Sequence, residues 1–217
     1  LHCGPFLAAV GELVVVAASR AERAVEAADG AAVSIDTRHA DVMAAALAAG
    51  ARIVNDVTAL EGQGSLEVVA RAQCPVVLMH HQGDFRTMQE RPAYRDVVLD
   101  VADYLAGRLA ACRTAGIAAD RIVLDPGIGF GKTVGHNLAL LHQLALLHQL
   151  GRPLLVGASR KSFIGRLSRG ADSASRAPGG VSSKVVAACS TAPSPIQCRC
   201  SARKAMGPPA SQRALPV

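Results

Sequence analysis

Residues 122–133 read Ile-Val-Leu-Asp-Pro-Gly-Ile-Gly-Phe-Gly-Lys-Thr, an apolar run that leads into a glycine-rich loop. A short, continuous run of this kind is typical of a strand buried on both faces of a parallel sheet. The run ends in the carboxylate of Asp125. Alternate glycines exceed what a plain turn requires, and they allow a sharply folded loop that we expect to present Phe130 and Lys132. The stretch therefore predicts a parallel strand with a functional loop at its carboxyl end.

The same pattern recurs through residues 31–165. Further short apolar runs end in polar or glycine residues at 33–36, 53–56, 76–80 and 154–157. Helices are predicted between the strands at 40–49, 65–73, 94–115 and 137–150. Alternation of strands and helices, with about 30 residues per unit, predicts an α/β fold with right-handed crossovers.

Two architectures have this alternation, the doubly wound sheet and the (β/α)8 barrel. A doubly wound sheet gathers its ligand groups at one switch point, whereas a barrel takes them from the ends of many strands. Several predicted strands end in polar residues, so we predict an incomplete (β/α)8 TIM barrel with about five recognisable units. Residues 13–28 are expected to be helical despite the Val-Val-Val at 14–16. The first two strands and the last strand of a complete barrel have no evident counterpart.

Composition divides the chain of 217 residues into three parts. Residues 1–30 are expected to be a poorly defined, partly helical remnant, and residues 31–165 are the predicted partial barrel. Residues 166–217 form a tail rich in Arg, Ser, Ala and Pro. The formal charge is −1 over residues 1–165 and +7 over this tail, which together make the net +6. We interpret the tail as disordered or as the product of a shifted reading frame.

Charge and hydropathy exclude several classes of partner. The basic tail lacks interleaved aromatic residues, so it does not predict a nucleic-acid interface. No apolar run approaches the ~20 residues of a membrane helix, and no basic stretch precedes an apolar run as in a signal peptide. The six cysteines show no disulfide or zinc pattern. We expect a soluble, cytoplasmic protein.

A second polar turn, Val-Gly-Ala-Ser-Arg-Lys-Ser at 156–162, follows the last predicted strand. Backbone N–H groups at a helix start suit an anion, and Lys161 adds a point charge. Capping of the helix by Ser159 or Ser162, with incidental surface charges, explains the turn equally well.

Asp36, Asn55 and Asp56 stand at the ends of two further predicted strands. Taken singly, each is best explained as the cap of the helix that follows. If these residues and Asp125 lay together on one face of a barrel, they would instead indicate a binding site. Carboxylates and an amide gathered there suit a planar heterocycle whose edge alternates hydrogen-bond donors and acceptors.

Histidines are the natural candidates for acid–base chemistry near neutral pH. His80 and His81 follow the strand predicted at 76–80 and are expected to face a site. No His-Glu-x-x-His or other metal spacing occurs, so we assign no metal ligands.

Several motifs, taken in order, resemble those of the dihydropteroate synthase family. They are Ser-Ile-Asp-Thr at 34–37, Val-Asn-Asp at 54–56, Leu-Met-His at 78–80, the loop at 124–132, His-Asn-Leu at 136–138 and Gly-Ala-Ser-Arg-Lys-Ser at 157–162. The resemblance implies a (β/α)8 barrel enzyme of folate biosynthesis, a target of sulfonamides. It also implies the reaction: p-aminobenzoate joins 6-hydroxymethyl-7,8-dihydropterin diphosphate, giving 7,8-dihydropteroate and diphosphate in the presence of Mg²⁺.

The resemblance further implies how the pterin is held. Asp125 would bind the edge formed by the amino group and a ring nitrogen. Asn55 and Lys161 would bind other pterin heteroatoms. Asp36 would lie behind the ring, and Met79 would pack near it. Asp125 and Lys161 are therefore the expected catalytic residues.

For the second substrate, the resemblance implies a slot lined by Phe130 and the aliphatic stem of Lys161. Ser162 would meet the carboxylate of p-aminobenzoate at a helix start, which agrees with the anion site inferred from that turn. We expect small-molecule partners, sulfonamides as inhibitors, and a homodimer as the candidate assembly.

The sequence departs from the family pattern at three places. No counterpart is found for the family's first-strand loop with its metal- and diphosphate-binding Asn, for the Ser-Thr-Arg loop after the second strand, or for the terminal Arg-x-His. Two alternatives therefore stay open. One is a pterin-binding methyltransferase module of the same barrel type, and the other is an inactive synthase fragment.

Overall fold

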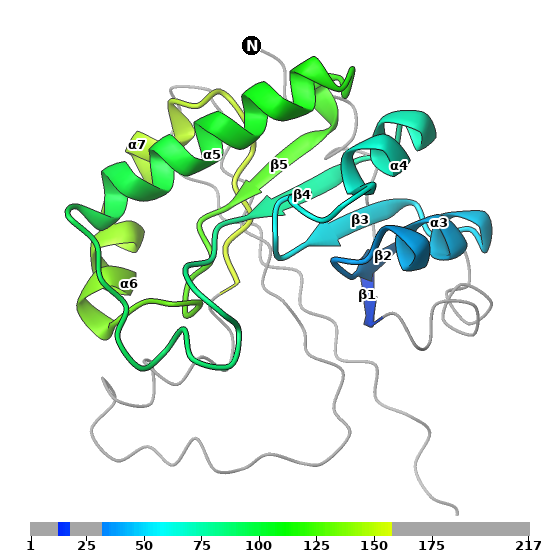
Figure 1. Cartoon of the computed structure of the whole chain (residues 1–217). Helices are drawn as coiled ribbons and strands as arrows, with labels where there is room; N and C mark the ends of the chain where they lie inside the picture. The colour runs from blue at the N-terminus through cyan, green and yellow to red at the C-terminus, as the bar shows by residue number, and fades with distance from the viewer. Residues whose placement is uncertain (1–12, 18–31, 158–217) are drawn as a thin grey trace, which may run out of the picture.

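A computed structural model describes residues 13–17 and 32–157, and its centre is a parallel sheet of five strands (Figure 1). The strands are β1 (Leu13–Ala17), β2 (Ala32–Asp36), β3 (Ile53–Asp56), β4 (Val76–Met79) and β5 (Ile122–Asp125). They lie side by side in chain order, and each pairs in parallel with the next. Strands β2 to β5 confirm four of the predicted strands.

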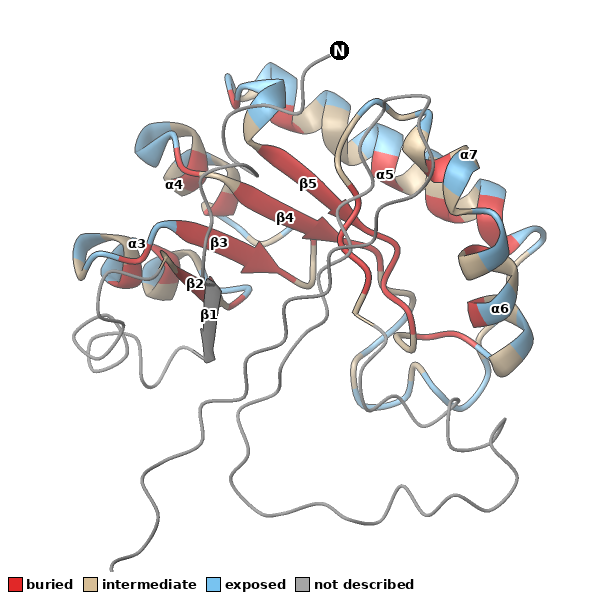
Figure 2. Cartoon of the chain, turned by 180° about the vertical axis from the view of Figure 1, so that it is seen from behind, coloured by how far each residue is buried: buried red, intermediate tan, exposed pale blue. Residues whose placement is uncertain are grey.

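The order of the strands decides between the two predicted architectures. A doubly wound sheet reverses direction at its switch point, whereas this sheet adds every new strand on the same side of the last. The helices α3 (Ala40–Ala48), α4 (Ser65–Ala72) and α5 (Val97–Thr114) accordingly lie along one side of the sheet (Figures 1 and 2). This singly wound arrangement is the wall of an incomplete (β/α) barrel, as predicted.

Residues 13–17 correct the prediction of a helix over 13–28. They form β1, which pairs along its whole length with β2, from Leu13 opposite Ala32 to Ala17 opposite Asp36. The β-branched Val-Val-Val favours an extended backbone, and pairing with a neighbouring strand satisfies its backbone groups. The rest of that predicted helix lies outside the described residues.

The strand predicted at 154–157 is reduced to one bridge. Leu154 pairs with Leu124 of β5, and the N–H of Leu155 donates to the carbonyl of Leu124 at 2.8 Å. The N–H of Leu124 donates to Pro153 at 2.9 Å. This segment therefore continues the order of the sheet beyond β5.

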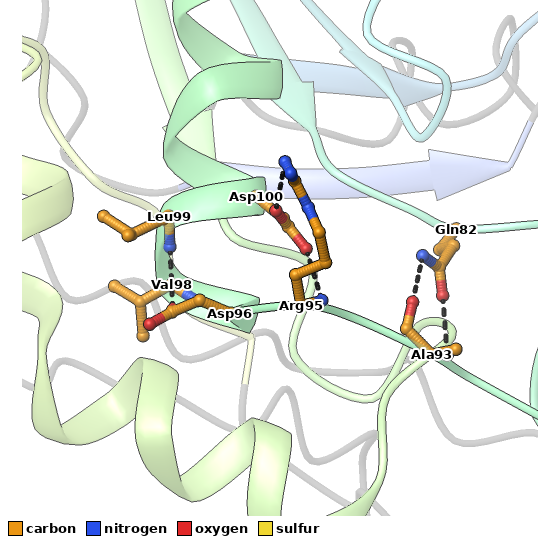
Figure 3. Close-up of polar contacts among 7 residues, drawn as sticks. All are labelled: Gln82, Ala93, Arg95, Asp96, Val98, Leu99 and Asp100. Atoms are coloured by element: carbon orange, nitrogen blue, oxygen red, sulfur yellow. Dashed lines mark hydrogen bonds and ion pairs between the residues drawn. The ribbon is translucent and has the colours of Figure 1, made fainter.

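Helix ends follow local signals. The α5 helix begins at Val97, three residues after the predicted start, because the Asp96 side chain caps it by accepting from the N–H groups of Val98 and Leu99 (Figure 3). It ends at Thr114, and Gly116, just past the C-cap Ala115, has a φ of 83°. The N–H of Ile117 then donates to the Cys112 carbonyl at 2.9 Å, as in a Schellman motif.

The single helix predicted at 137–150 is wrong in two respects. Thr133 forms a capping box with His136, so α6 (Val134–His142) begins earlier. Gln143 then leaves the helical conformation, with φ −109° and ψ 29°, and α7 (Leu144–His148) follows as a separate segment. The bend lets the chain follow the core, in which Leu140 and Leu147 are fully buried.

The two faces of the sheet have different roles. Alternate strand residues pack against the helices in the main apolar core: Val33, Ile35, Val54, Val76, Leu78, Ile122 and Leu124. The residues between them point to the opposite face, where Val77, Val123 and Leu155 form a separate small cluster. Strands β3, β4 and β5 are buried at every position, and therefore on both faces (Figure 2). No helix within the described ranges is both long and apolar enough to cross a membrane.

Candidate active site

Four predicted pocket residues share one face and one end of the sheet. Asp36, Met79 and Asp125 are the last residues of β2, β4 and β5, and Asn55 is the last but one of β3. Asp36 lies opposite Asn55 in the strand register, and Met79 lies opposite Asp125. By strand alternation all belong to the face away from the helices, which is the interior of a barrel. The structure therefore brings these four residues together, whereas their roles in binding stay predictions.

Asn55 contributes a buried side-chain amide to this end of the sheet. Its side chain is only 4% exposed, and within the described part of the chain its Nδ2 has no hydrogen-bond partner. A buried donor without a partner costs about 1–3 kcal/mol. The amide nitrogen is therefore available to an acceptor on a bound molecule.

Asp56, the next residue, holds the turn that follows β3. It does not cap α4, whose N-cap is Gly64. Its carboxylate accepts from the N–H and hydroxyl of Thr58, both at 2.7 Å, and from the N–H of Leu60 at 3.0 Å. Burial raises the pKa of Asp56, and the hydrogen bonds from Thr58 and Leu60 oppose that rise. Arg108 of α5 donates to the Ala59 carbonyl at 2.8 Å, which further fixes this turn.

Asp125 begins the glycine loop, and its Oδ1 accepts from the N–H of Gly127 at 2.7 Å. Gly127 has a φ of 67°, and a Cβ there would lie 1.8 Å from the carbonyl oxygen of His80. At Gly131, with φ 60°, a Cβ would lie 2.6 Å from the Gln82 carbonyl. The glycines are required because the loop lies directly against the backbone that follows β4.

The prediction that the loop presents Lys132 is wrong, whereas Phe130 is half-buried beside it. Lys132 is only 4% exposed. Its Nζ lies 2.9 Å from Nδ1 of His80 and donates to the Phe130 carbonyl at 3.0 Å. The side chain folds back because these acceptors, which the loop and the end of β4 supply, replace its hydration.

His80 is not placed to act as an acid or base near neutral pH. It is 5% exposed, and burial, reinforced by the Lys132 charge, lowers its pKa from 6.5 to about 3. His81 stacks on Phe85 with the ring centroids 4.6 Å apart. Burial also lowers the pKa of His81.

His81 lines an open groove of about 380 Å³ at the same end of the sheet. Its other walls include Arg38, Glu61 and Asp84, from the loops after β2, β3 and β4. The Arg38 guanidinium lies 5.4 Å from the centroid of the Phe85 ring. The groove therefore borders the end of the sheet at which the pocket residues gather.

Sequence reasoning missed the residues that hold the glycine loop. The Tyr94 hydroxyl donates to the Gly131 carbonyl at 2.8 Å. Asn137 accepts from the N–H of Gly129 at 2.7 Å and donates to Thr133 at 2.8 Å. The Gln82 side chain donates to the carbonyl of Ala93 and accepts from its N–H (Figure 3). These two hydrogen bonds hold the segment that carries Tyr94. Only the His-Asn-Leu motif hinted at Asn137, and it suggested no role.

Lys161 and Ser162 lie outside the described residues, so their predicted roles stay predictions. The Mg²⁺ implied by the resemblance has no fitting donor set in the part of the chain that is described. Among residues 13–17 and 32–157, no three His, Cys, Asp or Glu side chains are grouped so as to hold a metal ion.

A singly wound parallel sheet with polar residues at the interior carboxyl ends of its strands defines a (β/α)-barrel ligand-binding protein. Comparison with known proteins narrows this class. The family model for the pterin binding enzyme matches residues 14–193, a wider span than the 31–165 over which the motifs occur.

Curated and solved relatives agree with the family model. The dihydropteroate synthase of Neisseria meningitidis serogroup C is 47% identical over 161 residues, which are 73% of this chain and 57% of that protein. The Xanthomonas albilineans dihydropteroate synthase in complex with 7,8-dihydropteroate has a TM-score of 0.66 and 39% identity, covering 77% of this chain and 68% of that one. For the Yersinia pestis enzyme with a sulfonamide drug, the TM-score is 0.70 and the identity 35%, over 77% and 68% of the two chains.

The chain therefore belongs to the pterin binding enzymes and, among them, to the dihydropteroate synthase family. It spans a little more than half of the Neisseria relative, 57% of its length.

Proposed function

We propose that this chain carries the pterin pocket of a dihydropteroate synthase. The reaction joins 6-hydroxymethyl-7,8-dihydropterin diphosphate to p-aminobenzoate, giving 7,8-dihydropteroate and diphosphate. One observation carries the proposal: the Asn55 amide, whose Nδ2 has no hydrogen-bond partner among the described residues, and the carboxylate of Asp125 lie on the same interior face, at the same end of the sheet. An acceptor and a donor placed in this way suit the edge of a pterin ring.

The pocket residues would act by positioning and electrostatics. The carboxylate of Asp125 accepts from the pterin amino group and ring N–H, and the Asn55 amide donates to another heteroatom of the ring. Breaking the bond between the methylene carbon and the diphosphate oxygen leaves positive charge conjugated with the pterin. A carboxylate at the ring edge stabilises that charge as it develops. The arylamine nitrogen then forms the new C–N bond and releases its proton to solvent, so no protein nucleophile is required.

The second substrate would enter beside the glycine loop. Phe130 lies on that loop and offers an aromatic surface to the p-aminobenzoate ring. Lys161 and Ser162 would complete the slot, with Ser162 at the substrate carboxylate. A sulfonamide that occupies this slot would compete with p-aminobenzoate. A homodimer and a cytoplasmic location stay predictions from the sequence.

The named relatives favour the synthase over a methyltransferase module, since they are dihydropteroate synthases. Activity of the chain is tested by incubating it with both substrates and measuring 7,8-dihydropteroate and diphosphate. We expect product only when both substrates are present, and loss of product in Asp125→Asn.

A matched control for Asp125→Asn is Asp120→Asn, because Asp120 is exposed at the opposite end of β5. Product formation that is equal in Asp125→Asn and Asp120→Asn contradicts the proposed role of Asp125. Pterin binding without product identifies the chain as an inactive synthase fragment with an intact pocket. Dependence on a corrinoid protein favours the methyltransferase alternative.

A further inference from the structure

We propose that His80 and Lys132 form a positioning pair that fixes the glycine loop in its binding conformation before substrate arrives. The inference rests on the proposed function, since it concerns how the same pocket is held. Asp125 begins the loop and Phe130 lies within it, so a fixed loop fixes both residues. His80 and Lys132 would therefore contribute to pterin binding without touching the pterin.

His80 contacts both ends of the loop. Its backbone N–H donates to the carbonyl of Asp125 at 2.9 Å, where the loop begins. Its Nδ1 lies 2.9 Å from Nζ of Lys132, where the loop ends. Between these two contacts, the Lys132 ammonium donates to the Phe130 carbonyl at 3.0 Å. The pair therefore closes the loop onto the residue that directly follows β4.

Burial makes the contact between the two side chains specific. Lys132 and His80 are only 4% and 5% exposed. A lysine ammonium has only donors, so Nδ1 of His80 must be the acceptor and the ring proton must be on Nε2. Replacement of Lys132 would leave Nδ1 of the buried His80 without its hydrogen-bond donor. Replacement of His80 by an apolar residue would leave the buried Lys132 ammonium without one of its acceptors.

Tyr94 adds a third support to the pair. Its ring centroid lies 5.9 Å from the Lys132 ammonium, within the range of a cation–π interaction. Its hydroxyl donates to the Gly131 carbonyl at 2.8 Å. The segment after β4 thus holds the loop through a histidine and a tyrosine that lie fourteen positions apart in the printed sequence, at 80 and 94.

The loop needs such support because of its own composition. Gly127, Gly129 and Gly131 all have positive φ values, of 67°, 79° and 60°. Glycine has more backbone conformations to lose than any other residue, so an unsupported loop would populate many other shapes. A loop that is already ordered spares the substrate the free energy of ordering it.

The decisive variant is Lys132→Met, which keeps the aliphatic stem and removes the ammonium. We expect pterin affinity, measured by fluorescence titration of the full chain, to fall about tenfold through lost preorganisation. Amide hydrogen exchange at residues 127–131 should become faster in the same variant. Wild-type affinity together with unchanged exchange would overturn the proposal.

Replacement of His80 separates positioning from bulk stability. His80→Asn keeps an acceptor close to the position of Nδ1, so it should retain most of the affinity, whereas His80→Leu should lose it as Lys132→Met does. Val69→Ala is the stability control, because Val69 is fully buried in α4 and belongs to the helix-facing core. It should lower the free energy of unfolding without changing affinity under conditions where the protein is folded. Equal affinity in His80→Asn and His80→Leu would contradict the proposal.

A measurement on the wild type needs no variant to fold. Long-range ¹H–¹⁵N correlation of the histidine rings should show His80 neutral, with its proton on Nε2. A His80 ring protonated on Nδ1 overturns the pair, whether or not pterin binds. Failure of the wild type to bind pterin, with His80 in the expected tautomer and the loop protected from exchange, would instead refute the proposed function alone.

Discussion

Asn55 and Asp56 are consecutive residues of β3 that point to opposite faces of the sheet. Asp56 is fully buried on the helix side, and its carboxylate accepts three hydrogen bonds from Thr58 and Leu60. Asn55 is buried on the interior side with its amide nitrogen unpartnered in the described part of the chain. One residue therefore serves the fold, and its neighbour is available to a ligand.

Replacement of Asn55 by alanine should separate binding from stability. We expect pterin affinity to fall at least about tenfold, the value of one lost hydrogen bond in a dry site. The free energy of unfolding should fall by less than about 1 kcal/mol or should rise, because the amide nitrogen has no hydrogen bond to lose within the described residues and its removal relieves the cost of burying it. Fluorescence titration and urea unfolding measure the two quantities. A large loss of stability with unchanged affinity would show that Asn55 is structural.

Replacement of Asp56 by alanine should have the opposite effect. It leaves the donors of Thr58 and Leu60 without their acceptor inside the protein, which we expect to cost about 2–4 kcal/mol of unfolding free energy. Urea unfolding checks this value, with the exposed Asp120→Ala as the control for loss of a carboxylate. Equal free energies of unfolding in the two variants would mean that the hydrogen bonds of Asp56 make no net contribution to stability.

Gly127 and Gly107 form a matched pair for alanine substitution. At Gly127 a Cβ would lie 1.8 Å from the His80 carbonyl, whereas at Gly107, within α5, it would meet nothing within 4 Å. We expect Gly127→Ala to displace the loop and abolish pterin binding. Gly107→Ala should leave binding intact and stabilise the protein by about 0.5–1 kcal/mol, since alanine is the better helix former. Thermal unfolding and titration measure both, and normal pterin affinity in Gly127→Ala would refute the described loop.

The free energy of unfolding should depend on the protonation of His80. Lys132, His81, Tyr94 and Tyr104 are the ionisable or aromatic groups around its ring. The folded pKa is lowered from 6.5 to about 3, so between these pH values the unfolded chain binds the proton and the folded protein does not. The contribution of His80 to the free energy of unfolding is therefore complete above pH 6.5, and it is lost as the pH falls toward about 3.

The contribution of His80 can be isolated by comparing the wild type with His80→Asn. In that pH interval the wild-type stability should fall by up to about 1.4 kcal/mol per pH unit more than that of the variant. Urea unfolding at several pH values within the interval gives both slopes. Parallel slopes would mean that His80 is charged in the folded protein.

Local signals were enough to predict most of the fold. The strands β2 to β5 are short apolar runs with polar ends, and α5 ends at Thr114, just before the glycine at 116 that predicted its end. The strand β1 could not be predicted, because a short apolar run with no alternation fits a buried strand and a buried helix equally well. Pairing with β2 decides its structure, and that contact is non-local.

The candidate site was predictable to the extent that it depends on strand ends. Parallel strands bring their carboxyl ends together, so Asp36, Asn55 and Asp125 converge as expected. The burial of Lys132 was not predictable, since its partner His80 is 52 positions away in the chain. A glycine loop gives no local indication of which way its lysine folds.

Binding of a pterin at the interior carboxyl ends of the strands is best tested by calorimetric titration of a reduced pterin. The titration compares the wild type with Asn55→Ala, Asp125→Asn and the control Asp120→Asn. We predict saturable one-site binding in the wild type and in Asp120→Asn, and greatly weakened binding in the two pocket variants. Equal binding by all four proteins, or no binding by the folded wild type, would contradict the account.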